Sequence, residues 1–169
     1  NILGIGSATG DDNNRGVLIN GAGSTVISEE QGNITISGTG GNNMAAGSDN
    51  NRGVEISGAG LVVSQGSGAT AGTITINGTG GAGGAGTNNS EGVLLINMGS
   101  QIASIDGDVT VVGTGSTAAG GANNNEGVEI ANLAQINISG AADVIVNGTA
   151  GPTTTEGVRT LLITGGSII

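Results

Sequence analysis

A sequence repeat is the feature that most constrains what this chain can fold into. The dipeptide Gly-Val occurs five times, in steps of 37, 39, 35 and 30 residues, and Gly-Thr marks the end of four units, in steps of 40, 35 and 35 residues. Self-similarity at such a period indicates a repeat architecture, in which each unit packs on its neighbours. The repeat glycines are Gly16, Gly53, Gly92, Gly127 and Gly157.

Each unit contains three short patches of β-branched residues. The first patch follows Gly-Val, the second lies eight to ten residues later, and the third ends at Gly-Thr; a Gly- and Asn-rich stretch of variable length leads to the next unit. In the third patch, alternate aliphatic residues share one parity, as in a half-buried strand, and we expect them to face a core. The second patch is compatible with either parity. The predicted core residues of the third strands are Ile34, Ile36, Ile74, Ile76, Val109, Val111, Val144 and Val146.

Three short strands and a variable loop describe one turn of a parallel β-helix. The predicted fold is all-β: a right-handed parallel β-helix, or β-solenoid, with about five turns of roughly 36 residues and a single segment over residues 1–169. Strands stacked about 4.8 Å apart would enclose a narrow core that small aliphatics fill, and glycine suits corners that need φ > 0. A sandwich or a propeller is the competing all-β fold, but those folds usually carry aromatic residues, and this chain has none.

Both ends of the chain match interior parts of a turn. Residues 1–5 resemble a third strand, and residues 165–169 resemble the beginning of a second strand. An uncapped β-helix exposes a layer of unpaired strand edges. The sequence therefore predicts a segment cut mid-turn at both ends, either a window of a longer chain or the protomer of a filament. Its expected partners are adjoining repeats or copies stacked head-to-tail.

The absence of several residue types excludes whole classes of chemistry. The chain has no Cys, His, Lys, Trp, Tyr or Phe, and its net charge is −10. It therefore lacks the residues for a thiol nucleophile, a zinc or haem site, a Ser-His-Asp triad or a P-loop. An acidic chain without aromatic stacking platforms is also a poor binder of nucleic acid, and no apolar run is long enough to span a membrane. We expect no enzymatic activity, no catalytic residue and no cofactor.

Carboxylates are the remaining candidates for chemistry. Asp106 and Asp108 lie two residues apart at the start of a third strand, but neither the aromatic platform of a sugar-cleaving site nor the basic residue of a lyase accompanies them. Asp11, Asp12 and Asp49 precede repeat glycines, and their oxygens suit calcium. Weak calcium binding by these acidic loops is an alternative to the expectation of no metal.

An Asn recurs three residues before the repeat glycine in four units. Stacked amides at one corner can form a hydrogen-bonded ladder along the axis, although Asn also tolerates turn conformations. Either role is structural. The predicted Asn column is Asn13, Asn50, Asn89 and Asn124.

Two further columns run through the repeat. The column that precedes the repeat glycines changes sign midway, and we interpret it as a solvated corner. An Arg52–Glu91 contact there, if exposed, would add well under about 1 kcal/mol. Its members are Arg15, Arg52, Glu91, Glu126 and Glu156. The second is an outer threonine column, which makes ice binding a minor alternative function. It comprises Thr35, Thr75 and Thr110 and ends at Ile145.

The unit reads N-N-x-G-V-x-I, then V-I-S or similar, then G-N-I-T-I-x-G-T-G-G, most clearly over residues 13–41 and 50–81. This pattern resembles the repeats of filamentous-haemagglutinin-like adhesins, autotransporter passengers and related β-strand-repeat surface proteins of bacteria. The resemblance covers essentially the whole chain and implies a β-helical shaft that is secreted to an extracellular or cell-surface location.

The sequence and this resemblance together predict a function. The expected role is a non-enzymatic structural shaft of a secreted bacterial surface fibre or adhesin. The alternative is an extracellular module that binds host or matrix glycans on a β-helix scaffold, and a carbohydrate-active enzyme is a minor possibility.

Overall fold

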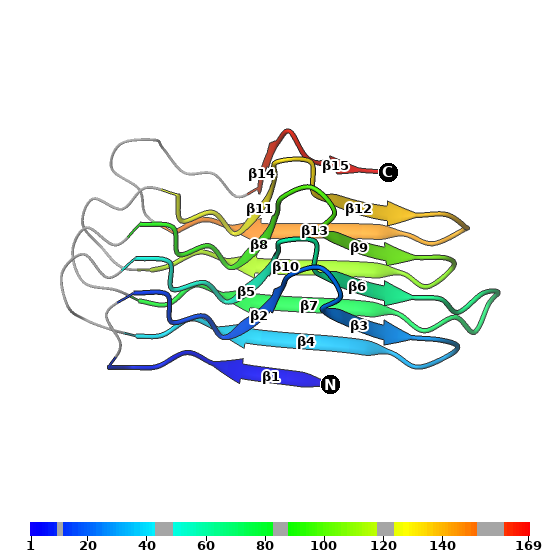
Figure 1. Cartoon of the computed structure of the whole chain (residues 1–169), viewed down its shortest axis with the longest axis horizontal. Helices are drawn as coiled ribbons and strands as arrows, with labels where there is room; N and C mark the ends of the chain where they lie inside the picture. The colour runs from blue at the N-terminus through cyan, green and yellow to red at the C-terminus, as the bar shows by residue number, and fades with distance from the viewer. Residues whose placement is uncertain (10–11, 43–48, 83–87, 118–123, 152–160) are drawn as a thin grey trace.

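The chain folds as a parallel β-solenoid with three strands per turn and no helix among the described residues (Figure 1). The computed structural model describes residues 1–9, 12–42, 49–82, 88–117, 124–151 and 161–169. The strands form three five-stranded sheets, and every pairing between named strands is parallel. The path from the first to the last strand of each sheet makes about four turns, and the two termini lie at opposite ends of the stack.

Each predicted patch of the repeat contributes to one sheet. The first-strand sheet contains β2 (Val17–Asn20), β5 (Val54–Ser57), β8 (Val93–Ile96), β11 (Val128–Ala131) and β14 (Leu161–Thr164). The second-strand sheet contains β3 (Thr25–Ser28), β6 (Leu61–Ser64), β9 (Gln101–Ser104), β12 (Gln135–Ile138) and β15 (Ser167–Ile168). The third-strand sheet contains β1 (Ile2–Ile5), β4 (Ile34–Thr39), β7 (Ile74–Thr79), β10 (Val109–Thr114) and β13 (Val144–Thr149). As the sequence predicts, β1 joins the third strands and β15 the second strands.

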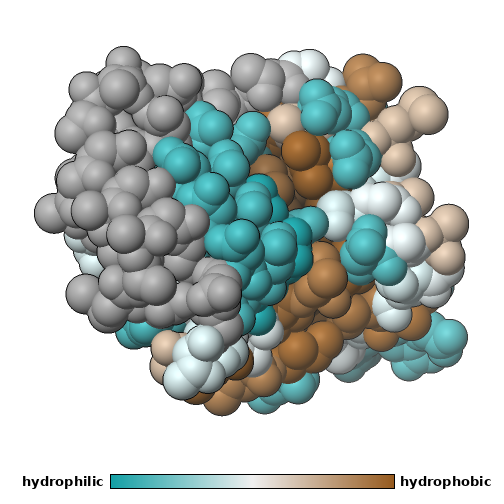
Figure 2. All heavy atoms as spheres, turned by 60° about the vertical axis from the view of Figure 1, so that its left-hand side comes forward, coloured by the Kyte–Doolittle hydropathy of each residue, from teal (hydrophilic) through white to brown (hydrophobic). Residues whose placement is uncertain are grey.

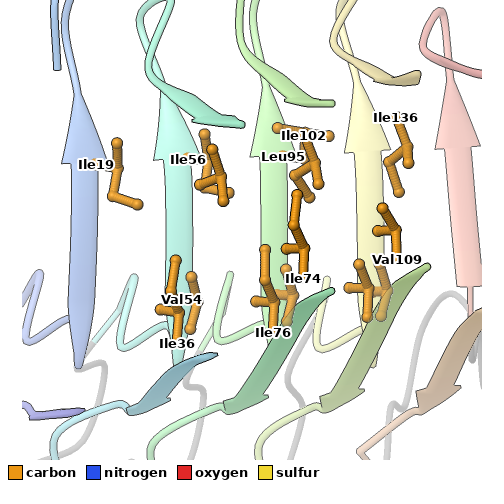
Figure 3. Packing of buried hydrophobic residues seen from close by; sticks show 14 of the residues in the cluster. Ile19, Ile36, Val54, Ile56, Ile74, Ile76, Leu95, Ile102, Val109 and Ile136 are labelled. Atoms are coloured by element: carbon orange, nitrogen blue, oxygen red, sulfur yellow. The ribbon is translucent and has the colours of Figure 1, made fainter. Parts of the chain in front are cut away.

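Aliphatic side chains from all three sheets fill the space inside the coil (Figure 3). In the third strands, the six predicted core residues of β4, β7 and β10 are buried, while Val144 and Val146 of β13 are partly buried against the same cluster. The second strands, whose parity the sequence leaves open, direct Val62, Ile102 and Ile136 inward. A fully buried aliphatic of this size contributes about 1.5–3 kcal/mol to stability, so stacked columns of such residues suffice without an aromatic core.

Two columns of glycine meet where the third-strand sheet ends and the next first strand begins. A Cβ atom on Gly78 would lie 2.0 Å from the carbonyl oxygen of Gly92, and one on Gly53 would lie 2.3 Å from the backbone nitrogen of Thr79. The Gly-Thr and Gly-Val glycines therefore occupy positions where two backbones touch and no side chain fits.

The sequence assigned glycine at the corners to a need for positive φ, and for these two columns that assignment is wrong. The residues with positive φ include Gly21, Gly58 and Gly99, but none of the repeat glycines among the described residues. Close approach of backbones, rather than left-handed conformation, fixes glycine at the repeat markers. Gly157 lies outside the described residues.

Substituting one of these glycines tests this contact. Gly78→Ala should lower the free energy of unfolding by about 3 kcal/mol or more, because neither backbone can move without breaking the ladder. Urea denaturation followed by far-UV circular dichroism measures the change. The matched control is Gly32→Ala, whose added Cβ would meet only the flexible Ser28 side chain, at 2.9 Å. Equal stability losses in the two variants would contradict the close-approach explanation.

Candidate functional site

A buried column of polar side chains precedes the first strands, and we name this column the polar corner. Asn51, Ser90 and Asn125 in this column are all fully buried. The backbone and the side-chain nitrogens of Asn14 both donate to Asn51 Oδ1, at 3.1 and 3.2 Å. The backbone nitrogen of Asn51 donates to Ser90 Oγ at 3.3 Å, and that of Ser90 donates to Asn125 Oδ1 at 3.0 Å. Each bond joins one turn to the next, so the column binds the stack together along its axis.

The predicted Asn column lies one residue before the polar corner. Its four members, Asn13, Asn50, Asn89 and Asn124, all have positive φ, between 52° and 62°. Asn124 Nδ2 donates to Asn89 Oδ1 at 2.9 Å, which is one step of an amide ladder. Asn50 Oδ1 instead accepts from Arg52 Nη2 at 2.9 Å. The column thus combines both roles that the sequence leaves open, a left-handed turn conformation at every position and an axial amide contact.

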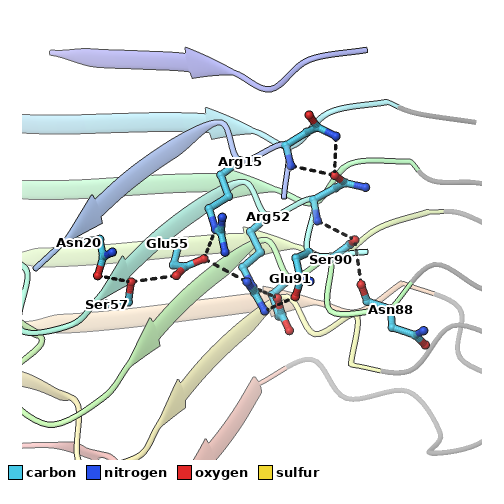
Figure 4. A network of polar contacts seen from close by, with 11 residues as sticks. Arg15, Asn20, Arg52, Glu55, Ser57, Asn88, Ser90 and Glu91 are labelled. Atoms are coloured by element: carbon cyan, nitrogen blue, oxygen red, sulfur yellow. Dashed lines mark hydrogen bonds and ion pairs between the residues drawn. The ribbon is translucent and has the colours of Figure 1, made fainter. Parts of the chain in front are cut away.

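Beside the polar corner, four charged residues form a network that crosses three turns (Figure 4). Arg15 Nε forms an ion pair with Glu55 Oε2, and Arg52 Nη1 donates to the same oxygen at 3.0 Å. Arg52 Nε also donates to Glu91 Oε2 at 2.6 Å. The other oxygen of Glu55 accepts from Ser57 Oγ at 2.8 Å. The network therefore alternates in sign: Arg15, Glu55, Arg52, Glu91.

This network corrects the interpretation of the charged column as a solvated corner. Glu91 is 1% exposed, and Glu55, which points away from the core, is only 7% exposed. Carboxylates are expensive to bury unless they are paired and hydrogen-bonded, and the two arginines supply that pairing. Figure 2 shows a hydrophilic band that follows the stacking direction beside the grey segments. Glu156 of the predicted column lies outside the described residues.

Burial and pairing act in opposite directions on the pKa values of this network. Burial raises the pKa of Glu91 to about 7, even though Arg52 pulls it down. Burial also disfavours the ionised form of Glu55, but Arg15 and Arg52 hold its pKa below the ordinary value. For Arg52, burial lowers the pKa and the two carboxylates outweigh it, so its pKa is raised.

Three carboxylates meet at the acidic end of the network. One ligand oxygen from each of Glu91, Glu126 and Glu129 lies within 4.8 Å of the others, and Glu126 is 1% exposed. An all-oxygen set of this kind suits a hard cation such as Ca²⁺. Glu126 and Glu129 also have other partners within the chain, so the cluster by itself does not define a metal site.

The acidic residues that the sequence offers for calcium lie elsewhere and accept backbone hydrogen bonds. Asp12 Oδ1 accepts from the backbone nitrogen of Asp49 at 2.8 Å, and Asp49 Oδ1 accepts from that of Asn88 at 2.7 Å. Asp11 lies outside the described residues. Asp12 and Asp49 thus bridge successive turns, as the polar corner does.

Asp106 and Asp108, the candidate catalytic pair, occupy similar structural positions. Asp106 accepts from the backbone nitrogens of Gly68, at 2.6 Å, and Ala141, at 3.0 Å, and these two bonds hold the pKa of its exposed carboxyl below the ordinary value. Asp108 Oδ1 accepts from the backbone nitrogen of Asp143 at 2.9 Å. Asp106 thus ties its turn to the turns on both sides, and Asp108 ties the same turn to the next one.

Shallow hollows mark the outside and one end of the solenoid. A hollow of about 240 Å³ lies on the outer side of the second-strand sheet, beside Gln65, Gln101 and Asn137. A larger one of about 510 Å³ lies at the N-terminal end of the core, between Ile2, Val17 and Val26. The part of the chain that the structure describes has no helix that could cross a membrane.

Comparison with known proteins gives no match. No family model fits the chain, and neither the curated proteins nor the solved structures include a significant relative. The resemblance to bacterial adhesin repeats therefore stays a prediction from the sequence.

The raised pKa of Glu91 predicts a pH-dependent stability. The folded chain holds the Glu91 proton up to about pH 7, whereas the unfolded chain releases it near 4.5. The free energy of unfolding should therefore fall as the pH rises through this window, by about 3 kcal/mol in total. Glu91→Gln cannot ionise and should flatten this slope, as measured by urea denaturation at pH values across the window.

The matched control for this experiment is Glu29→Gln, which removes an exposed carboxylate in the bend directly after β3. This variant should keep the slope of the unmodified chain. An unchanged slope in the Glu91→Gln variant would rule out Glu91 as its source.

Proposed function

We propose that this chain is a non-enzymatic shaft segment of a secreted bacterial surface fibre or adhesin, in which the β-solenoid continues by the stacking of further turns. The observation that carries the proposal is the set of three parallel ladders and one buried polar corner that run along a single axis. Such an arrangement gives a rod, and the rod is the functional element of a shaft.

The hydrogen bonds between turns support a mechanical role. In all three sheets, each strand pairs with the equivalent strand of the next solenoid turn. Backbone hydrogen bonds outside the strands also link successive turns, such as Gly53 N to Glu91 O at 3.1 Å and Gly92 N to Glu126 O at 3.0 Å. A force along the axis acts on all the bonds of one turn interface at once. An individual bond contributes only about 1 kcal/mol, so the resistance comes from their number.

The two ends of the solenoid offer sites for continued stacking. The edge strands are β1, β2 and β3 at one end and β13, β14 and β15 at the other. At the first end, the apolar hollow beside Ile2 opens the core outward. Unpaired strand edges of this kind template pairing with further strands, which either adjoining turns of the same polypeptide or a second copy would supply.

The charge of the chain supports separation of neighbouring shafts. A net charge of −10 on 169 residues repels like rods at low salt. End-to-end contact avoids much of this repulsion because the edge strand β1 carries no charged side chain.

Stacking between copies can be tested at the first end of the solenoid. The chain should form elongated particles with an axial repeat near 4.8 Å in cryo-electron microscopy. Ile2→Lys places a charge beside the open core, where a stacked copy would bury it, and should shift the material to single protomers. Leu3→Lys is the matched control, because Leu3 is 78% exposed on the outer face of the same strand. Monomeric unmodified chain, or equal effects of the two variants, would contradict stacking between copies.

The location of the protein provides the second test of the proposal. Antibodies raised against the purified chain should label intact producing cells, with gold particles along surface fibres in electron microscopy. Permeabilised cells and a strain that lacks the protein serve as the controls. Labelling that appears only after permeabilisation would overturn a role as a surface shaft.

A further inference from the structure

The outer side of the third-strand sheet carries a regular array of short side chains, which we name the threonine face. Its positions are the outward residues of β4, β7, β10 and β13. One column consists of threonine in all four strands, and a second consists of threonine in three. The two columns are Thr39, Thr79, Thr114 and Thr149, and Thr35, Thr75 and Thr110 with Ile145; between them lie Ser37, Asn77, Val112 and Asn147.

The strand register makes this array a lattice rather than a scatter of threonines. Thr39 pairs with Thr79, Thr79 with Thr114, and Thr114 with Thr149. Strands repeat about every 4.8 Å along the axis, and outward positions repeat about every 6.6 Å along a strand. The sequence predicts the outer column of Thr35, Thr75 and Thr110. It also shows the Thr39 column as the Gly-Thr marker, but the structure is needed to place both columns on one face.

The threonine hydroxyls of this face are both accessible and unengaged. Thr39, Thr79 and Thr149 are exposed, and Thr35, Thr75, Thr110 and Thr114 are half-buried. Among the described residues, the hydrogen bonds of side chains involve the corners and turns, and none uses a threonine hydroxyl of this face. Threonine is stiff at χ1, and its neighbours in the column restrict it further, so little conformational entropy is lost when a ligand binds.

The charge and composition of the threonine face favour a partner with an uncharged, regular surface. None of the twelve outward positions of the face holds an ionisable residue, although the chain carries a net charge of −10. A crystalline polysaccharide would be expected to use aromatic platforms, and the chain has no aromatic residue. The face covers roughly 400 Å², about half of what each partner contributes to a standard protein interface, which disfavours a protein partner.

We propose that the threonine face binds ice. Threonines within a column repeat about every 4.8 Å along the axis, and the two columns lie two outward positions apart, about 13 Å along the strands. A flat ice surface is likewise a regular lattice of water molecules in parallel rows. Each hydroxyl can donate to or accept from a lattice water, and each γ-methyl group packs into the space between rows. The inference goes beyond the shaft function and does not depend on it.

Two substitutions on the face test the proposal with the full chain. Asn77→Lys places a long charged side chain in the middle column of the face, and Thr79→Lys places one in the all-threonine column beside it. The matched control is Gln101→Lys, which adds the same charge on the outer side of the second-strand sheet, where Gln101 is half-buried. Circular dichroism and thermal unfolding establish that each variant is folded before it is assayed.

The readouts are thermal hysteresis and the uptake of fluorescently labelled chain into a growing ice hemisphere. The unmodified chain and Gln101→Lys should show both, and the two face variants should lose both while keeping their melting temperature. Absence of both signals from the unmodified chain would overturn the proposal, as would equal loss in all three variants. Absence of ice binding together with lateral association, abolished by Thr79→Lys in gel filtration, would identify the face as a contact between copies instead.

Discussion

The requirement that backbones stack in register along one axis governs the rest of this structure. Every turn must place a strand directly over a strand in three sheets at once, so the residues that set the shape of a turn have to recur at equivalent positions. The two glycine columns are the clearest example of such recurring residues. Because the backbone at Gly53 lies against that at Thr79, a side chain at either marker would push the turns apart, and the core columns on both sides would lose their packing.

The charged network shows how the same stacking makes burial of ions tolerable. A single buried carboxylate would destabilise the fold, but the carboxylates of Glu55 and Glu91 approach the arginines of other turns. Glu91 is the member in which burial outweighs pairing, and its raised pKa is the consequence. The charged network therefore couples the stability of the middle turns to pH, whereas the aliphatic core has no titratable group.

The periodic part of the fold could be predicted from the sequence, and the non-periodic part could not. Ile36 and Val111 alternate with outward residues in the third strands, so their direction follows from parity alone. By contrast, the burial of Glu91 depends on its contact with Arg52 of the preceding turn. The local sequence pattern does not indicate how far either side chain is buried. The last turn departs from the repeat as well, since Val128 pairs with Leu161, whereas in the earlier turns the valine of one Gly-Val dipeptide pairs with that of the next. The acidic turn residues Asp106 and Asp108 were recognised as candidates for chemistry, but their bonds to backbone nitrogens of other turns depend on three-dimensional spacing.

The alternating charges also give the turns of the solenoid an order. Columns of valine, isoleucine or threonine are nearly the same at each level, so they would accept the turns in any sequence, or a slip by one whole repeat. The charged column changes sign once, from Arg52 to Glu91, and Glu55 pairs with both arginines. A slip by one whole repeat would therefore separate Arg52 from Glu91, or Glu55 from Arg15, and leave a buried charge without its partner. The charged network thus specifies which turn stacks on which, although the backbones of the turns are nearly alike. A permuted chain with the same turns in another order would have the same composition and a weaker stack.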